Sequence, residues 1–189
     1  MRDPEIRAEL HRRLKRRHAS NGATRIVDEM AVLTGACRID VAVINGRLEG
    51  FEIKSESDSL DRLPRQAAAY ARVFDRLTVI CAERHLERAL ATLPAWWGIE
   101  VASTKDGQPR LIRKRPARAN PTVEPEAVAQ LLWRAEALAA LEELGVAEGL
   151  KNKPRRVLWA ELAAAVPRNQ LRALVRECLA ARQGWLAAG

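Results

Sequence analysis

The first hundred residues of the chain alternate between two hydrophobic patterns. In residues 5–18 and 62–74 an apolar side chain recurs every three or four positions, which is the period of an amphipathic helix. Short apolar runs bounded by turn residues predict strands. We predict a further helix at residues 86–93 and strands at residues 24–32, 37–44, 50–55, 77–82 and 99–103. Helices interleaved with strands in this order indicate an α/β fold with a mixed sheet.

The pattern changes after the last predicted strand. Residues 105–109 predict a turn, and residues 114–125 hold three prolines and few apolar side chains. Beyond this break the spacing of apolar residues indicates helices only. We predict one through Val128, Leu131, Ala135, Leu138 and Ala139 that ends near Gly145, and two more at residues 157–165 and 169–182. The chain therefore divides into a core at residues 1–115, a linker at 116–126 and an all-helical extension at 127–189.

Composition narrows the class of protein. Of the 189 residues, 48% are hydrophobic and 30% are charged, which is typical of a globular protein in water. No apolar run approaches the roughly 20 residues of a membrane span, and no secretory segment follows Met1. The three cysteines are far apart and lack C-x-x-C spacing, so neither a zinc site nor a disulfide framework is indicated. We predict a cytoplasmic protein without membrane contact.

The excess of basic residues in the chain favours a polyanionic partner. The net charge is +8 and the pI is about 10.1. Residues 1–22 carry seven Lys and Arg against three acids, and residues 105–118 carry six against one. Solvated surface is the alternative for both clusters. The candidates for contact with nucleic-acid phosphates are Arg13, Arg16, Arg17, Arg38 and Arg62.

Three charged residues interrupt two neighbouring predicted strands. Side chains alternate between the faces of a strand, so Glu52 and Lys54 share one face. A three-residue loop around Asn45-Gly46 would place Asp40 directly opposite Glu52. Burying an unpaired charge costs roughly several kcal/mol, so a cluster of charges within these strands indicates a functional role. Two adjacent carboxylates suit a hard divalent cation such as Mg²⁺.

This arrangement resembles a known superfamily of nucleases. An Asp on one strand, followed by Glu-x-Lys on the next, resembles the PD-(D/E)xK superfamily, and Gln66-Ala67-Ala68-Ala69-Tyr70 resembles the Gln-x-x-x-Tyr element of RecB-like and Cas4-like nucleases. The proline of the superfamily name is absent, because Ile39 precedes Asp40. The resemblance covers roughly residues 5–100. It is strongest to the uncharacterised sce7726 group, whose pattern is echoed by Asp28-Glu29, Arg38-Ile39-Asp40, Gly50 to Ser55, Arg62-Leu63 and Gln66 to Tyr70.

The resemblance implies a restriction-endonuclease-like fold and roles for particular residues. Asp40, Glu52 and the backbone carbonyl of Ile53 would bind Mg²⁺, with Mn²⁺ accepted in its place. Lys54 would orient or deprotonate the attacking water and stabilise the developing charge.

Supporting residues follow from the same resemblance. Gln66 and Tyr70 lie one helical turn apart, and such a pair leans over the active site in RecB-like enzymes. Glu29 is our first choice for the third carboxylate that is usual in the superfamily, and Glu9 on the first helix is the rival.

These residues also have alternative structural roles. Asp40 could belong to a surface strand pair and form a salt bridge with Arg38 or Lys54. Gln66 could lie at the boundary of the core with Tyr70 inside it. Arg62 could be a solvated surface residue, and Glu29 and Glu9 could be solvated charges.

Two further features have a structural and a functional interpretation. Trp96-Trp97 follows a proline, and we expect core packing there rather than a platform for base stacking. Arg168, Arg172 and Arg176 are four residues apart and align on one face of the last predicted helix, within a helix-turn-helix-like pair. That face could meet a DNA backbone, or the extension could pack on the core and leave a solvated basic stripe.

The sequence thus predicts a Mg²⁺-dependent deoxyribonuclease that acts in repair or phage defence. We expect nucleic acid as its partner, DNA rather than RNA, with a homodimer or a partner protein as further options. One alternative is a non-catalytic nucleic-acid-binding protein that retains the nuclease fold. Another is a defence effector that depends on a partner protein.

Overall fold

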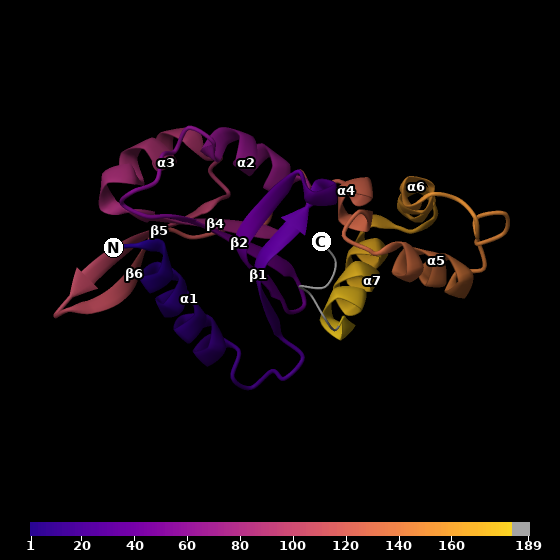
Figure 1. Ribbon diagram of the computed structural model, residues 1–189, viewed down its shortest axis with the longest axis horizontal. Helices are drawn as coiled ribbons and strands as arrows, with labels where there is room; N and C mark the ends of the chain where they lie inside the picture. The colour runs from indigo at the N-terminus through magenta and orange to yellow at the C-terminus, as the bar shows by residue number, and fades with distance from the viewer. Residues whose placement is uncertain (183–189) are drawn as a thin grey trace.

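The computed structural model describes residues 1–182, which form one mixed sheet of six strands with helices against both of its faces (Figure 1). The strands are β1 (Arg25–Val32), β2 (Cys37–Ile44), β3 (Leu48–Lys54), β4 (Arg76–Ala82), β5 (Gly98–Lys105) and β6 (Gln108–Arg115). The helices are α1 (Asp3–Arg17), α2 (Leu63–Ala71), α3 (Leu86–Thr92), α4 (Pro125–Ala129), α5 (Arg134–Glu143), α6 (Arg155–Ala165) and α7 (Arg168–Ala181), with short 3-10 turns η1 (Leu33–Gly35) and η2 (Glu83–His85). None of these helices is long and apolar enough to span a membrane.

The strands cross the sheet in the order of the chain, from β1 to β6. The pairs β3–β4 and β4–β5 are parallel, and the other neighbouring pairs are antiparallel. Each parallel pair is joined by a crossover that contains a helix, α2 in the first and α3 in the second, as parallel strands require. The predicted α/β class, with a mixed sheet, flanking helices and a helical C-terminal region, is confirmed.

Helix α1 covers one face of the sheet because its apolar residues recur at helical spacing. Ile6, Leu10 and Leu14 are fully or almost fully buried. They belong to a cluster with residues of the inner strands, namely Val41, Val43, Phe51, Ile53 and Ile80. This packing places the N-terminal helix across one face of the sheet, against residues of β2 to β6.

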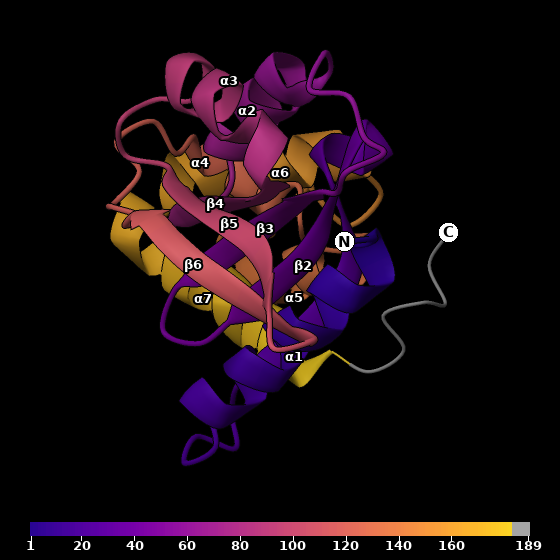
Figure 2. The same ribbon diagram turned by 90° about the vertical axis from the view of Figure 1, so that its left-hand side faces the viewer.

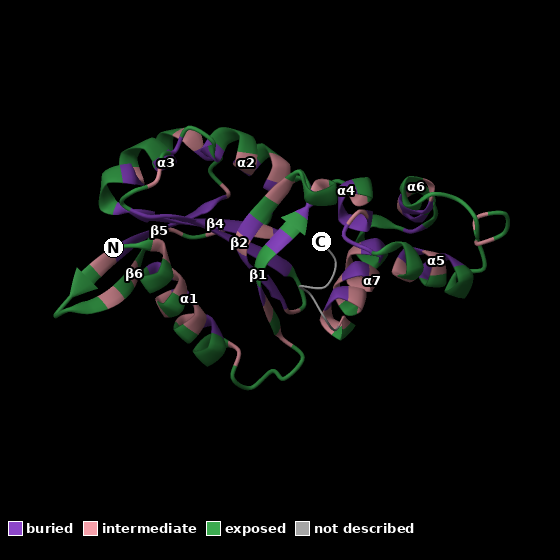
Figure 3. Ribbon diagram, viewed as in Figure 1, coloured by how far each residue is buried: buried purple, intermediate pink, exposed green. Residues whose placement is uncertain are grey.

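Helices α2 and α3 cover the opposite face of the sheet (Figure 2). The same hydrophobic cluster continues into the C-terminal helices α4 to α7, which lie beyond the β1 edge (Figures 1 and 3). Leu158, Leu171 and Val175 of the extension therefore share a core with Tyr70 and Phe74. The extension is packed as part of the molecule, and its helices do not form a separate core.

Asp75, which follows α2, fastens the last helix to the sheet. Its carboxylate accepts a hydrogen bond from the Leu48 N–H at 2.7 Å and pairs with Arg172, while Arg176 Nη1 lies 3.8 Å from it. Arg172 and Arg176 therefore face the core, and Arg168 remains exposed. Of the two interpretations of this basic stripe, packing on the core is the one observed for Arg172 and Arg176.

The segment predicted as a linker, residues 116–126, runs along the core. Its backbone is tied to the core by the Arg118 N–H, which donates to the Trp96 carbonyl at 2.8 Å, and by the Asn120 N–H, which donates to the Asp75 carbonyl at 2.9 Å. The Asn120 side chain is buried. These bonds hold the extension in place against the sheet.

Two elements differ from the prediction. Residues 108–115 form the edge strand β6, whose sequence Gln-Pro-Arg-Leu-Ile-Arg-Lys-Arg lacks the apolar run of a buried strand. The single helix predicted after Val128 is two helices, because the Glu136 side chain accepts the Trp133 N–H at 2.7 Å and caps a new helix there. The expectation for the tryptophan pair agrees with the structure, since Trp97 is fully buried.

Gly50 in the middle of β3 allows close packing behind the strand that carries the charged cluster. A Cβ atom at this position would lie 2.7 Å from Leu77 Cδ2, 2.9 Å from Ile39 Cδ1 and 3.1 Å from Phe74 Cδ1. We predict that Gly50→Ala lowers the free energy of unfolding by about 1–3 kcal/mol through overpacking. Urea denaturation measures this change. Gly22→Ala is the matched control, because no atom lies within 4 Å of its added Cβ, and equal stability of the two variants would contradict the prediction.

Candidate active site

The charged cluster lies where β2 and β3 diverge. The strands pair from Ile44–Leu48 to Val41–Phe51, which leaves the three-residue loop that the sequence predicts. The next pair in this register would be Asp40 and Glu52. Instead of continuing the backbone ladder there, the Asp40 side chain accepts the Ile53 N–H through Oδ2 at 2.6 Å. The carboxylate thus replaces a strand partner and lies beside the Glu52 position.

Glu52 is 2% exposed and is surrounded by donors. Its Oε1 atom accepts hydrogen bonds from Lys54 Nζ and from Gln66 Nε2, each at 2.7 Å. Its Oε2 atom is buried and has no hydrogen-bond partner among the described residues. A buried carboxylate oxygen without a donor is costly, and it indicates a place where a cation or a water belongs.

Helix α2 brings its polar pair over this carboxylate. Gln66 and Tyr70 lie one turn apart, with Gln66 Nε2 3.4 Å from the Tyr70 hydroxyl. The Tyr70 hydroxyl donates to the Arg38 carbonyl of β2 at 2.6 Å. Burial, and then the charge of Glu52, raise the pKa of Tyr70, so its hydroxyl stays protonated and remains a donor. Tyr70 is thus a core residue whose hydroxyl also links α2 to β2 by a hydrogen bond.

Arg7 of α1 completes the cluster, and the sequence reasoning missed it. Its guanidinium donates to the Asp40 carbonyl at 2.7 Å, to Asp40 Oδ1 at 3.2 Å and to Glu29 Oε1 at 2.9 Å. Arg7 follows the buried Ile6 and lies three residues before Leu10, beside the apolar stripe of the helix. That position was the available signal, because a residue at the edge of such a stripe reaches the sheet.

The third carboxylate lies close by, but it is bound to Arg7. The β1–β2 register places Glu29 opposite Asp40, between the pairs Asp28–Val41 and Met30–Ile39. Glu29 has a left-handed backbone with φ 54°, and that pair is missing from the ladder. Its rival, Glu9, binds Arg12 at 2.7 Å. Within residues 1–182 no three His, Cys, Asp or Glu side chains are grouped so as to hold a metal ion.

The five arginines predicted to bind phosphate fall into two groups. Arg13 pairs with Glu100 at 2.5 Å and Arg17 pairs with Glu49 at 3.1 Å, so both fasten α1 to the sheet. The side chains of the other three are exposed at the surface, and they are Arg16, Arg38 and Arg62. The predicted alternative of a salt bridge between Asp40 and Arg38 is not observed, because Arg7 takes that place.

Comparison with known proteins identifies the family. The family model described as Bacteriophage P4 protein cII matches residues 1–185. The chain belongs to this family. Protein cII of Enterobacteria phage P4 is 26% identical over 175 residues, which are 93% of this chain and 65% of that protein, so the chain spans about two thirds of its relative. Among solved structures, the SPO1766 protein of unknown function from Silicibacter pomeroyi has a TM-score of 0.42 and 19% identity, over 81% of this chain and 98% of that one.

The electrostatics of this cII family member centre on its two adjacent carboxyl groups. Burial, and then the nearby charge of Glu52, raise the pKa of Asp40 to about 7, although the Ile53 N–H and Arg7 oppose the rise. Burial likewise raises the pKa of Glu52, against the opposing charge of Lys54. Two carboxyl groups that resist ionising together favour a cation between them.

The residues present fit a divalent cation of the Mg²⁺ type. Such a cation takes one or two carboxylates and completes its shell with water and phosphate oxygens. Glu52 Oε2 is open, and each oxygen of Asp40 has a second lone pair beside the one it already uses. The N–H and C=O groups of one strand residue point toward the same neighbouring strand, so the Ile53 carbonyl faces Asp40 as its N–H does. Asp40, Glu52 and Ile53 could together hold the ion.

The raised pKa of Asp40 predicts a pH-dependent stability of the metal-free protein. The ordinary value is 3.8, so the folded protein keeps a proton that the unfolded chain releases as the pH rises from about 4 to about 7. The free energy of unfolding therefore falls over this window, by on the order of 2 kcal/mol. Asp40→Asn should flatten the fall, as measured by urea denaturation in excess EDTA at several pH values.

The control for this measurement is Asp106→Asn. Asp106 lies exposed in the turn between β5 and β6, and its removal should leave the pH dependence of the wild type in place. If the free energy of unfolding falls as steeply with pH in Asp40→Asn as in the wild type, the burial of the Asp40 carboxyl group is contradicted.

Proposed function

We propose that this member of the P4 cII family is a metal-dependent nuclease that hydrolyses phosphodiester bonds, in DNA rather than RNA. One observation carries the proposal: Asp40 and Glu52 meet at the point where two strands diverge, with Lys54 Nζ 2.7 Å from Glu52 and a Glu52 oxygen that has no partner in the described part of the chain. The basic net charge of +8 supports a polyanionic substrate.

The divalent cation would acidify an attacking water and neutralise charge on the phosphate. Asp40 and Glu52 hold its position from two strands that the β2–β3 hairpin fixes relative to each other. Asp40 cannot rotate freely, because the Ile53 N–H and Arg7 bind its two oxygens. Ligands fixed in this way keep the reacting groups in place. Such positioning accounts for a large part of the rate acceleration by enzymes.

Lys54 is the residue placed to handle the proton and the developing charge. Its Nζ atom is almost buried and is anchored by Glu52, so it enters the site in one orientation. An ammonium held there can orient the attacking water and stabilise negative charge on the phosphate oxygens. The Gln66 Oε1 atom is buried without a partner among the described residues and can accept a hydrogen bond from the same water.

A non-catalytic nucleic-acid-binding protein is the second candidate. One observation favours it: each carboxylate already has a cation of the chain, Arg7 on Asp40 and Lys54 on Glu52. These pairs offset part of the charge of Asp40 and Glu52 without a metal ion, although Arg7 is shared with Glu29. A protein that had lost catalysis could keep this cluster as a structural feature of the hairpin.

Cleavage assays separate the two candidates. Plasmid and single-stranded DNA are incubated with the protein at several Mg²⁺ and Mn²⁺ concentrations. We predict that Asp40→Asn, Glu52→Gln and Lys54→Met each reduce the cleavage rate at least about 100-fold. Binding of DNA, measured in excess EDTA, should change little in all three variants, because the loss concerns the chemical step.

Glu87→Gln is the matched control for this assay. Glu87 is an exposed residue of α3 and has no role in the cluster, so its variant should cut at the rate of the wild type. Binding of DNA without cleavage by the wild type, with either metal, would favour the non-catalytic candidate. Full activity of Glu52→Gln would place the reaction elsewhere in the molecule.

A further inference from the structure

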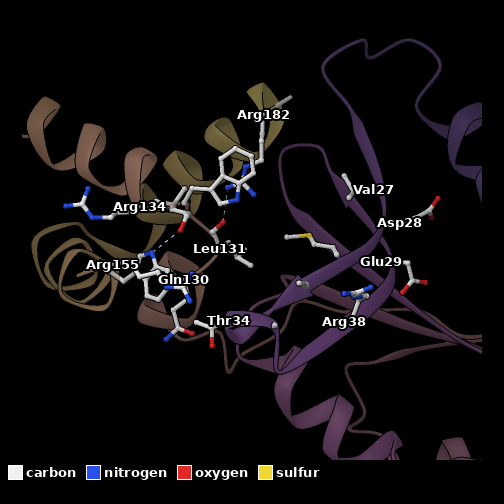
Figure 4. A pocket seen from close by; sticks show the side chains of 16 residues that line it. Val27, Asp28, Glu29, Thr34, Arg38, Gln130, Leu131, Arg134, Arg155 and Arg182 are labelled. Atoms are coloured by element: carbon white, nitrogen blue, oxygen red, sulfur yellow. Dashed lines mark hydrogen bonds between the residues drawn. The ribbon is translucent and has the colours of Figure 1, made fainter. Parts of the chain in front are cut away.

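A groove of about 710 Å³ lies beside the candidate active site, between the β1 edge of the sheet and the C-terminal helices (Figure 4). One wall comes from β1, η1 and the start of β2, and includes Glu29, Thr34 and Arg38. The other wall comes from the helical extension and includes Trp133 and Arg155. The two walls belong to parts of the chain about a hundred residues apart, so the extension creates the groove.

Three arginines that form no ion pair with an acidic residue among residues 1–182 face this groove. The Arg38 side chain is exposed and forms no hydrogen bond or ion pair within the described part of the chain. Arg155 is exposed as well, and its guanidinium lies 5.2 Å over the ring of Trp159. Arg134 binds the carbonyls of Lys151 and Lys153, which leaves its charge uncompensated. Such cations attract an anion that the groove can admit.

An aromatic ring is exposed among these cations. Trp133 is 38% exposed, although a tryptophan at the start of a packed helix is normally covered. The Arg182 guanidinium lies 4.2 Å over its ring, and Trp133 lines the groove. Positive charge beside an accessible aromatic ring is the combination that binds single-stranded nucleic acid, with phosphates on the cations and a base on the ring.

Two residues of the groove contact the candidate active site. Glu29 lines the groove and accepts a hydrogen bond from Arg7, which also binds Asp40. Arg38 lines it too, and the Arg38 carbonyl accepts a hydrogen bond from Tyr70. A strand that lies in the groove would therefore lie next to the residues that hold the carboxylates.

The backbone at the rim of the groove is strained in several places. Glu29, Leu33 and Thr34 have left-handed φ values of 54°, 50° and 58°, although none of them is glycine. Each such residue costs roughly 1–3 kcal/mol, and such strain is concentrated at functional sites. Two of the three, Glu29 and Thr34, line the groove.

We infer that this groove binds a single-stranded segment of nucleic acid and leads it to the Asp40–Glu52 cluster. That the bound strand is then cleaved rests on the proposed nuclease function. That the groove binds a strand is argued from its lining residues alone. The volume is that of a pocket for a small ligand. We therefore expect it to admit a short stretch of one strand rather than a duplex.

Fluorescence anisotropy with a short fluorescein-labelled oligodeoxythymidine tests the inference on the whole chain, in excess EDTA so that no cleavage occurs. We expect Trp133→Ala to weaken binding at least about fivefold, and Trp133→Phe to restore most of it because the ring is kept. Arg155→Ala should weaken binding and lower the salt dependence of log K by about 0.7, the contribution of one phosphate contact.

Arg110→Ala is the matched control, since Arg110 is an exposed arginine on β6 with no part in the groove. Its binding should equal that of the wild type, and circular dichroism and thermal melting verify that every variant is folded. A duplex of the same sequence should bind more weakly than the single strand.

Three outcomes would overturn the inference: unchanged binding in Trp133→Ala and Arg155→Ala, equal binding of the duplex, or equal displacement of the oligonucleotide by poly-glutamate. The last would point to an acidic peptide as the occupant. The outcome for the nuclease is independent. If the wild type cleaves DNA but the groove variants bind as the wild type does, only the proposed role of the groove is contradicted. If binding depends on the groove but no cleavage occurs, only the proposed nuclease function is contradicted.

Discussion

Two carboxylates held side by side, largely out of water, are the constraint on which the site depends. Glu52 is buried and Asp40 lies next to it where β2 and β3 part, so burial raises the pKa of both groups and the charge of Glu52 raises that of Asp40 further. The fold offsets this repulsion with Arg7, Lys54 and the Ile53 N–H, which reach the pair from α1 and β3. Removing one of these donors leaves a buried charge uncompensated, which is far more costly than never having placed it there.

The layers of the fold hold these side chains in fixed positions around the two carboxylates. Helix α1 is fixed by its apolar stripe and by the ion pairs of Arg13 and Arg17 with the sheet, and this anchoring delivers Arg7 to Asp40. Helix α2, in the crossover on the opposite face, delivers Gln66 to Glu52. The site is thus built where two layers meet at one end of the central strands, and neither layer alone could complete it.

Much of the hairpin could be predicted from sequence because its signals are local. Strand alternation places Glu52 and Lys54 on one face, and the loop length sets the register with Asp40. The missed features depend on packing between distant segments. Arg7 lies among many arginines, and only the seating of α1 on the sheet distinguishes it. The contact of Arg172 with Asp75 joins residues 97 apart, and β6 is an edge strand whose polar sequence carries no strand signal. The groove could not be predicted for the same reason, since its walls meet only in the folded chain.

The internal ion pairs bear on the choice between a metal centre and a structural cluster. Lys54 pairs with Glu52, but Arg7 is shared between Asp40 and other carboxylates, among them Glu29. The carboxylates of the cluster therefore outnumber its cations. A divalent cation would offset this excess negative charge, which otherwise repels a phosphodiester, so the internal ion pairs do not disfavour a metal centre. What distinguishes the two cases is Glu52 Oε2, which has no hydrogen-bond partner within residues 1–182. A purely structural cluster would gain by satisfying that oxygen, as buried polar groups in folded proteins almost always are, whereas a ligand oxygen must be left open for the ion that it binds.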